Sequence, residues 1–314
     1  MELNRNKVDH WKADSAASVD FYNNWFLDFA PRAFREARRK SERIVESAFS
    51  ELEAADMLSG NLLAARPRLM TVLRMMTCPP IARDRLAGLA SVAPSAVKNA
   101  EETGKWKRAM PNECVSRIFH VLWKLLDKEL FSWLLSRNSH GDSISRDRAV
   151  LIVADRLCGA MSDPYIRNAQ EKRQLTAIEK FLVRKGYSKA APSSHEDLLP
   201  GQFAFHLNIR VHIGDDGSRS VNIPVDVAIQ PRSAQKGRLP LIIEAKSAGD
   251  FANVNKRRKE EAQKVAQLRQ AYGDVRFYLF LCGYFDSGYL GYEAAEGIDW
   301  IWEHRMSDME KLGL

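Results

Sequence analysis

Apolar residues recur at helical spacing through the first half of the chain. The segments Asp20–Leu58 and Ser116–Leu135 both place them along one helix face, and the second is richer in aromatic residues. Pro79, Pro80, Pro94 and Gly104 interrupt this pattern. We therefore predict that residues 15 to about 160 form a series of short helices without strands.

The pattern changes character after this region. One helix is predicted from Asp163 and Pro164, which open it, to Gly186, which closes it. Alternating apolar and polar residues then predict an antiparallel hairpin, with strands over residues 205–213 and 218–229 around the turn Gly-Asp-Asp-Gly. A third strand over 239–247, a helix over 254–273 and a wholly apolar strand over 275–283 complete the order.

This order predicts the fold class. Three strands, a helix and a fourth strand fit an α/β (α+β) architecture with a mixed sheet flanked by helices, in which one strand-helix-strand crossover joins the third and fourth strands. We expect two parts: a largely helical domain over residues 1–160 and a sheet-containing domain over residues 161–314.

Three charged residues interrupt apolar strands in the second part. Asp226 lies on the second strand of the hairpin, and Glu244 and Lys246 lie on the third strand. Burying a charge is costly unless it is paired or binds a metal. Glu244 and Lys246 point to one face because strand side chains alternate, and Asp226 joins them if the two strands pair in register.

Two carboxylates and an ammonium on one face suit metal-assisted hydrolysis. Carboxylate oxygens supplemented by a backbone carbonyl are ligands that Mg²⁺ prefers, so Asp226, Glu244 and the Ala245 carbonyl are the candidate metal ligands. The metal can polarise a phosphodiester and lower the pKa of a bound water. Lys246 can position or deprotonate that water and stabilise the developing charge.

These residues resemble the PD-(D/E)xK nuclease core, with Asp226 after Pro224-Val225 and Glu244-Ala245-Lys246 as its second half. More closely, the string IIEAKSAGDFANVNKRRKEEAQK resembles type II restriction endonucleases of the XamI type. The resemblance implies Mg²⁺-dependent cleavage of double-stranded DNA at a short palindrome, leaving 5′-phosphate and 3′-hydroxyl ends. It also implies that Asp226, Glu244 and Lys246 are catalytic, that a helix acid such as Glu171 or Glu179 joins them, and that a companion methyltransferase exists.

Charge and hydropathy agree with a nucleic-acid partner. The net charge is +7 and the isoelectric point is about 9.2, which favours polyanionic partners. No apolar stretch is long enough to cross a bilayer, and the polar N-terminus does not resemble a signal peptide, so we expect a cytoplasmic protein. The seven histidines show no ligand spacing; His206 and His212 share a strand face but lack a third partner there.

A run of cations is predicted where the helix after the third strand begins. Lys256, Arg257, Arg258 and Lys259 oppose the helix dipole at that end. A DNA phosphate held there would offset the cost, so we expect at least one of them to contact the DNA backbone. The ordinary alternative is a solvated helix face.

Residues 83–102 fit the spacing of a helix-turn-helix, in which small residues pack the two helices closely. Ser91 occupies the turn position where glycine is usual. If the motif binds DNA, the second helix enters the major groove and Ser95, Lys98 and Asn99 face bases or phosphates. Lys105, Lys107 and Arg108 would then follow the backbone. An ordinary helical hairpin explains the same small residues.

A palindromic target is read naturally by a two-fold dimer, so a homodimer is expected. Two other classes of function stay open at this point. One is a PD-(D/E)xK nuclease for repair or phage defence that has no fixed target sequence. The other is a non-catalytic helix-turn-helix regulator, against which the intact Asp226, Glu244 and Lys246 argue.

Overall fold

The structure is a computed structural model of the chain. It describes residues 2–55, 58–106, 110–134, 143–213, 219–235, 237–251 and 258–314. Among these residues, no helix is both long and apolar enough to cross a membrane.

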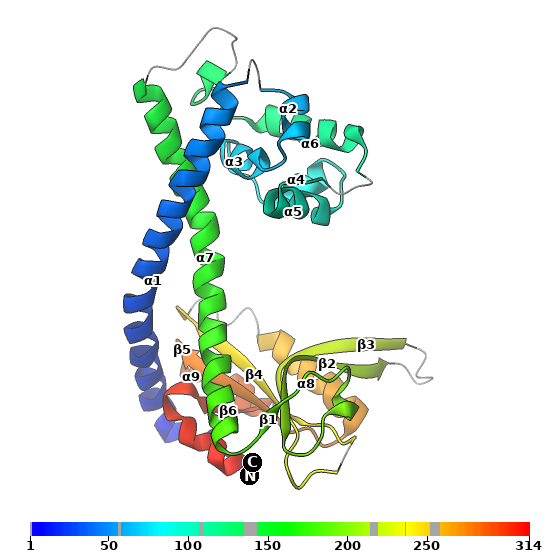
Figure 1. The fold of residues 1–314 in the computed structure, drawn as a ribbon. Helices are drawn as coiled ribbons and strands as arrows, with labels where there is room; N and C mark the ends of the chain where they lie inside the picture. Colours follow the sequence, from blue (N-terminus) through cyan, green and yellow to red (C-terminus); the bar gives the residue numbers. More distant parts are fainter. Residues whose placement is uncertain are drawn as a thin grey trace. The chain divides into compact units, whose positions relative to one another are not determined.

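The chain forms two compact units. One comprises residues 30–165, and the other comprises residues 1–29 together with 166–314. Two long helices, α1 (Val8–Glu53) and α7 (Ser143–Arg184), contribute residues to both units. Figure 1 shows both units, with α1 in blue and α7 in green.

The unit of residues 30–165 is helical. Between the two long helices, its described residues form the short helices α2 (Gly60–Ala65), α3 (Leu69–Met75), α4 (Arg83–Leu89), α5 (Pro94–Thr103) and α6 (Asn112–Leu125) and the 3₁₀ helix η1 (Ser132–Leu134). Their apolar faces enclose one core that includes Phe49, Met70, Leu86, Val97 and Ile118. The short helices predicted between the prolines are present here.

Helices α4 and α5 are joined by a tight turn that contains Ser91. Ser91 has φ 52°, in the left-handed region where glycine is favoured. Ala87 and Val97 are fully buried where the two helices pack. The buried Glu101 of α5 forms ion pairs with Arg74 of α3 and Arg83 of α4, which fixes α5 against both neighbours.

The other unit is built on a six-stranded mixed sheet in the order β1-β2-β3-β4-β5-β6. β2 is antiparallel to β3 and β3 to β4, whereas the β1–β2, β4–β5 and β5–β6 pairs are parallel. The strands are β1 (Ser188–Lys189), β2 (Gln202–Ile213), β3 (Arg219–Ile229), β4 (Leu241–Ala248), β5 (Phe277–Gly283) and β6 (Asp299–Trp302). The helices are α8 (Arg258–Tyr272), α9 (Ser287–Ala295) and the 3₁₀ segments η2 (His195–Asp197) and η4 (Glu303–Leu312).

Helices cover both faces of this sheet. On one face, Ile242, Leu279 and Trp300 pack with Val265 and Leu268 of α8. On the other face, Ile243, Phe280 and Ile301 pack with residues of α7 such as Ile178. β5 is therefore apolar along nearly its whole length because it is buried on both sides, whereas β4 begins with an apolar run and then carries Glu244 and Lys246.

At His206 on β2 and Asp226 on β3, the apolar side chains of the hairpin switch from one face of the sheet to the other. Before this point Phe203 faces the α7 side, and after it Leu207 and Ile209 face the α8 side. β3 does the same, since Val227 faces the α7 side while Val225 faces the α8 side. The ladder pairs Phe205 with Val227 and Leu207 with Val225, but it omits the pair between them. His206 has φ 51°, which accounts for the change of face on β2.

The N-terminal segment is anchored to the sheet of this unit. The carboxylate of Asp299 accepts hydrogen bonds from the backbone N–H groups of Leu3, Asn4 and Arg5 at 2.5 to 3.0 Å. The side chain of Asn4 also donates to the Trp300 carbonyl oxygen at 2.9 Å. These contacts explain why the first residues belong with the C-terminal part of the chain.

The predicted mixed sheet flanked by helices is confirmed as a mixed α/β fold, but the short strand β1 and the helix α9 were not predicted, and two further elements differ. The helix expected to begin at Asp163 instead begins at Ser143, and Pro164 lies inside it. A proline removes only one helical hydrogen bond, which a long packed helix tolerates at the cost of a kink. The strand β6 was also missed, because its Asp-Trp-Ile-Trp sequence is short and does not alternate.

Candidate functional site

The candidate site lies where β3 and β4 part. Their last ladder pair joins Val227 to Ile243, so Asp226 and Glu244 are the next residues on each strand. Beyond this pair the Asp226 carboxylate replaces the backbone ladder: its Oδ2 accepts a hydrogen bond from the Ala245 N–H at 2.8 Å. The register that the sequence required for Asp226 to meet Glu244 is therefore present.

Lys246 and Glu244 meet two residues of α8. Lys246 Nζ lies 3.2 Å from Glu244 Oε1 and 2.8 Å from Glu261 Oε1. Lys264 Nζ lies 2.8 Å from the same Glu244 oxygen and donates to the Pro224 carbonyl oxygen at 2.9 Å. We call Glu244, Lys246, Glu261 and Lys264 the lysine–carboxylate group. It is largely buried, with the Glu244 and Glu261 side chains 7% and 3% exposed.

Burial and neighbouring charges shift the pKa of two of these residues. The pKa of Asp226 is raised, first by burial and then by repulsion from Glu244, although the Ala245 N–H and the two lysines oppose the shift. Burial disfavours the charged form of Lys246, but Glu244 and Glu261 outweigh it, so the pKa of Lys246 is raised. The ammonium form of Lys246 is therefore favoured in this setting.

The donor set at this site fits a hard divalent cation. Oε2 of Glu244 and Oε2 of Glu261 are buried without a hydrogen-bond partner among the described residues. A buried carboxylate oxygen without a partner is costly, and binding a cation is one way to satisfy it. Asp226, Glu244 and the Ala245 carbonyl supply oxygen ligands of the kind that Mg²⁺ prefers.

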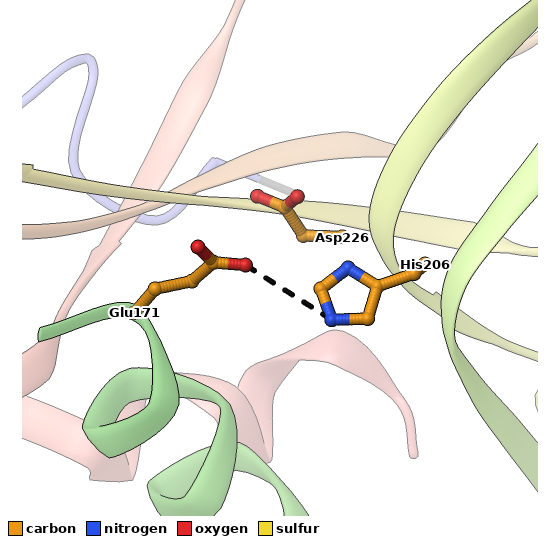
Figure 2. Close-up of side chains that lie close together, drawn as sticks. All are labelled: Glu171, His206 and Asp226. Atoms are coloured by element: carbon orange, nitrogen blue, oxygen red, sulfur yellow. Dashed lines mark ion pairs between the residues drawn. The ribbon is translucent and has the colours of Figure 1, made fainter. Parts of the chain in front are cut away.

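The two acids proposed on the preceding helix have different surroundings. Oε1 of Glu171 lies 4.0 Å from Nε2 of His206, and the two residues form a group with Asp226 whose ligand atoms all lie within 4.8 Å of one another. Figure 2 shows these three side chains pointing toward one another. Glu179 instead forms an ion pair with Lys189 at 3.3 Å. Of the two acids, Glu171 is the one grouped with Asp226.

The residues proposed to contact DNA are only partly described. Ser95 and Lys98 are exposed on α5, whereas the Asn99 side chain donates to the Lys105 carbonyl oxygen at 2.7 Å. That bond joins α5 to the segment after it and occupies one amide N–H of Asn99. Lys107, Arg108, Lys256 and Arg257 lie outside the described residues, as does the side chain of Arg258.

Four further residues at the site were not found from the sequence. Glu261 and Lys264 lie three residues apart on α8, a spacing that places them on one helix face, but nothing in the sequence showed which face meets β4. The Gln174 side chain donates to the carbonyl oxygens of Lys246 and Phe280 at 3.2 and 3.1 Å, so it bridges β4 and β5. His206 could not be found from the spacing of residues along β2, because the two acids that it lies near, Glu171 and Asp226, belong to other elements.

Comparison with known proteins gives two matches. Residues 53–302 match the model of the XamI restriction endonuclease family. The chain is also 46% identical over 319 residues to the type II restriction enzyme SalI of Streptomyces albus G, and this alignment covers 99% of each protein. No solved structure matches the chain.

Proposed function

The chain belongs to the XamI restriction endonuclease family, and we propose that it is a Mg²⁺-dependent type II restriction endonuclease with a PD-(D/E)xK core. As a member of this family it is a site-specific deoxyribonuclease. Its substrate is double-stranded DNA with a short palindromic site, and its products carry 5′-phosphate and 3′-hydroxyl ends. The observation that carries the proposal is the meeting of Asp226, Glu244 and Lys246 where β3 and β4 part.

Asp226, Glu244 and the Ala245 carbonyl would hold the cation in this proposal. The Ala245 N–H orients the Asp226 carboxylate, and Gln174 holds the adjoining backbone through the Lys246 carbonyl. When bound, Mg²⁺ would polarise the scissile phosphodiester and lower the pKa of a water molecule. The buried position of Glu244 keeps its carboxylate away from bulk water. In this less polar environment the carboxylate interacts more strongly with cations than it would in water.

Lys246 would act on the phosphate that is attacked. Glu244 and Glu261 hold its ammonium group from two sides, which restricts the position of Nζ. An ammonium fixed in this way can donate hydrogen bonds to phosphate oxygens as negative charge develops on them. Because both partners are buried carboxylates, we assign Lys246 to charge stabilisation and positioning rather than to deprotonation of water.

A palindromic site requires one cut in each strand. We propose that two copies of the chain act together, each cutting one strand, because a two-fold dimer matches the symmetry of such a site. A companion methyltransferase would protect the same sequence in the cell. The mass of the free protein and of its complex with a duplex, measured by light scattering, tests the dimer.

The direct test is cleavage of plasmid and phage DNA with Mg²⁺ or with EDTA. We expect discrete fragments that require Mg²⁺ and that are lost in Lys246→Ala and Asp226→Asn. Lys180→Ala, an exposed lysine of α7, is the matched control and should cut normally. A smear of fragments from the wild-type protein would favour a nuclease without a fixed target, and no cutting of any DNA would contradict the proposal.

A further inference from the structure

Lys264 of α8 connects the two strands at the point where they part. Its Nζ donates a hydrogen bond to the Pro224 carbonyl oxygen of β3 at 2.9 Å and lies 2.8 Å from Oε1 of Glu244 on β4. The Lys264 and Glu244 side chains are 18% and 7% exposed, so their contact is largely shielded from solvent. An ammonium group therefore occupies one oxygen of a proposed cation ligand.

The two oxygens of Glu244 have different surroundings. Oε1 is bound by two ammonium groups, that of Lys264 at 2.8 Å and that of Lys246 at 3.2 Å. Oε2 is buried and has no hydrogen-bond partner among the described residues. A cation that binds Glu244 through either oxygen would therefore come close to Lys264.

The two lysines differ in how they are held. Lys246 lies between two carboxylates, Glu244 and Glu261. Among the described residues, Glu244 is the only carboxylate that forms an ion pair with Lys264, whose hydrogen bond to Pro224 goes to a neutral oxygen. Loss of Glu244 as a partner would leave Lys246 paired with Glu261 but would leave Lys264 without a carboxylate.

The formal charges show what Lys264 contributes to the site. Asp226, Glu244 and Glu261 carry −3, and Lys246 and Lys264 carry +2, which leaves −1. Without Lys264 the same residues would carry −2, the charge that a divalent cation neutralises. Because like charges repel more strongly in a buried site than in water, Lys264 opposes a divalent cation at Glu244.

We infer that Lys264 is an internal counter-ion that competes with the divalent cation for Glu244. In the free protein its ammonium group neutralises Glu244, and a cation that binds there displaces it. Lys246 keeps its place, because Glu261 holds it independently of Glu244. The inference rests on the proposed function, since Glu244 is one of the proposed cation ligands.

Binding of Mn²⁺ to the full chain without DNA, followed by electron paramagnetic resonance, tests this competition. Lys264→Met removes the charge and keeps a long side chain. We expect this variant to bind Mn²⁺ at least about tenfold more tightly than the wild-type protein, because one positive charge near the cation is lost. A purely structural role of Lys264 predicts the opposite sign, since a disturbed site binds the cation less well.

Two controls locate the effect. Lys259→Met removes the same charge from an exposed position on α8 and should bind Mn²⁺ like the wild-type protein. Adding Glu244→Gln to Lys264→Met should abolish the gain in affinity if the gain arises at Glu244. An Mn²⁺ affinity of Lys264→Met equal to or lower than that of the wild-type protein would overturn the inference.

A measurement on the wild-type protein tests the displacement without any substitution. Lysines are acetylated with a water-soluble reagent, with and without saturating Mn²⁺, and each rate is followed by mass spectrometry. Lys264 should react several times faster when the cation has released it from Glu244, while the exposed Lys180 should react at one rate throughout. An unchanged or lower rate at Lys264 would mean that it stays on Glu244, against the inference. The proposed function fails separately, when the wild-type protein cuts no DNA in Mg²⁺.

Discussion

Glu261 acts on the site through another residue, because its carboxylate contacts Lys246 at 2.8 Å. We predict that Glu261→Gln lowers kcat by about tenfold or more, since a hydrogen bond to a charged group contributes about 1.5 to 3 kcal/mol. KM for a cognate duplex should change little if Glu261 only positions the Lys246 ammonium group. Single-turnover cleavage over a range of duplex concentrations separates the two effects.

Glu260 provides the control for this prediction, since it precedes Glu261 on α8 but is exposed. Glu260→Gln should cleave like the wild-type protein. If Glu261→Gln lowers the thermal stability of the protein and leaves kcat unchanged, Glu261 has only a structural role.

His195 couples stability to pH in the unit that contains the sheet. It is 4% exposed, its ring packs edge-on against Tyr272, and burial lowers its pKa below the ordinary 6.5 even though Glu196 and Asp197 oppose the shift. The unfolded chain then binds a proton more readily than the folded one. The contribution of neutral His195 to the stability of the folded state is therefore complete above pH 6.5, and it is lost as the pH falls from there through the lower pKa that His195 has in the folded state.

Urea unfolding at pH 7.5 and pH 5.0 measures this effect of His195. His195→Phe keeps an aromatic ring beside Tyr272 but cannot titrate, so it should lose less stability between these two pH values than the wild-type protein does. His212→Phe, at an exposed position, should keep the wild-type dependence on pH. An unchanged dependence in His195→Phe would contradict the assignment.

Sequence patterns identified the residues on β3 and β4 but not those that meet them from other elements. Side chains two apart on a strand share a face, which is why Glu244 and Lys246 could be paired before their positions were known. Glu261 depends on how α8 is rotated, and that is set by the packing of Val265 and Leu268 on the sheet. The direction of the His206 side chain depends on a positive φ, which no alternation of apolar and polar residues reveals.

Among the elements, the α4–α5 turn offers a direct test of backbone strain. Ser91 has φ 52°, which costs a residue with a Cβ atom roughly 1 kcal/mol relative to glycine. We predict that Ser91→Gly stabilises the helical unit by about 1 kcal/mol and raises its Tm by about 3 °C. Calorimetry of the full chain measures this shift.

Ala90 is the control for the turn, because it precedes Ser91 with φ −84° in the right-handed helical region. Ala90→Gly should destabilise the unit by about 1 kcal/mol, since glycine has more freedom to lose there. A fall in Tm for Ser91→Gly would show that the turn does not require glycine-like freedom.

Prediction of elements succeeded where apolar periodicity was long, and it failed for short strands such as β6 and where two signals competed. The hairpin and the apolar strand β5 follow from alternation and from a continuous apolar run. Pro164 suggested a helix start because proline favours the first turn, yet α7 continues through it, and Pro31 lies within α1 in the same way. In both helices the propensity of one residue was overridden by packing along the rest.

At the scale of the whole molecule, the positive charge is unevenly divided. The helical unit of residues 30–165 holds 22 Lys and Arg against 16 Asp and Glu, a net charge of +6, while the rest of the chain holds 25 against 24, a net charge of +1. Non-specific affinity for DNA comes mainly from cations that displace counterions at phosphates. The helical unit is therefore expected to supply most of the salt-dependent affinity for DNA.

Lys98 is the residue of α5 on which this expectation is best tested, because it is exposed on the helix predicted to enter the major groove. The test is the affinity for a duplex, measured by fluorescence anisotropy over a series of NaCl concentrations in EDTA, which prevents cleavage. If Lys98 contacts a phosphate, Lys98→Ala weakens binding and reduces the slope of log K against log[salt] by about 1.

Lys180→Ala, which removes the same charge from the other unit, should leave the slope unchanged. Equal slopes for the wild-type protein and Lys98→Ala would mean that this face of α5 makes no phosphate contact, and that α4 and α5 are a structural hairpin.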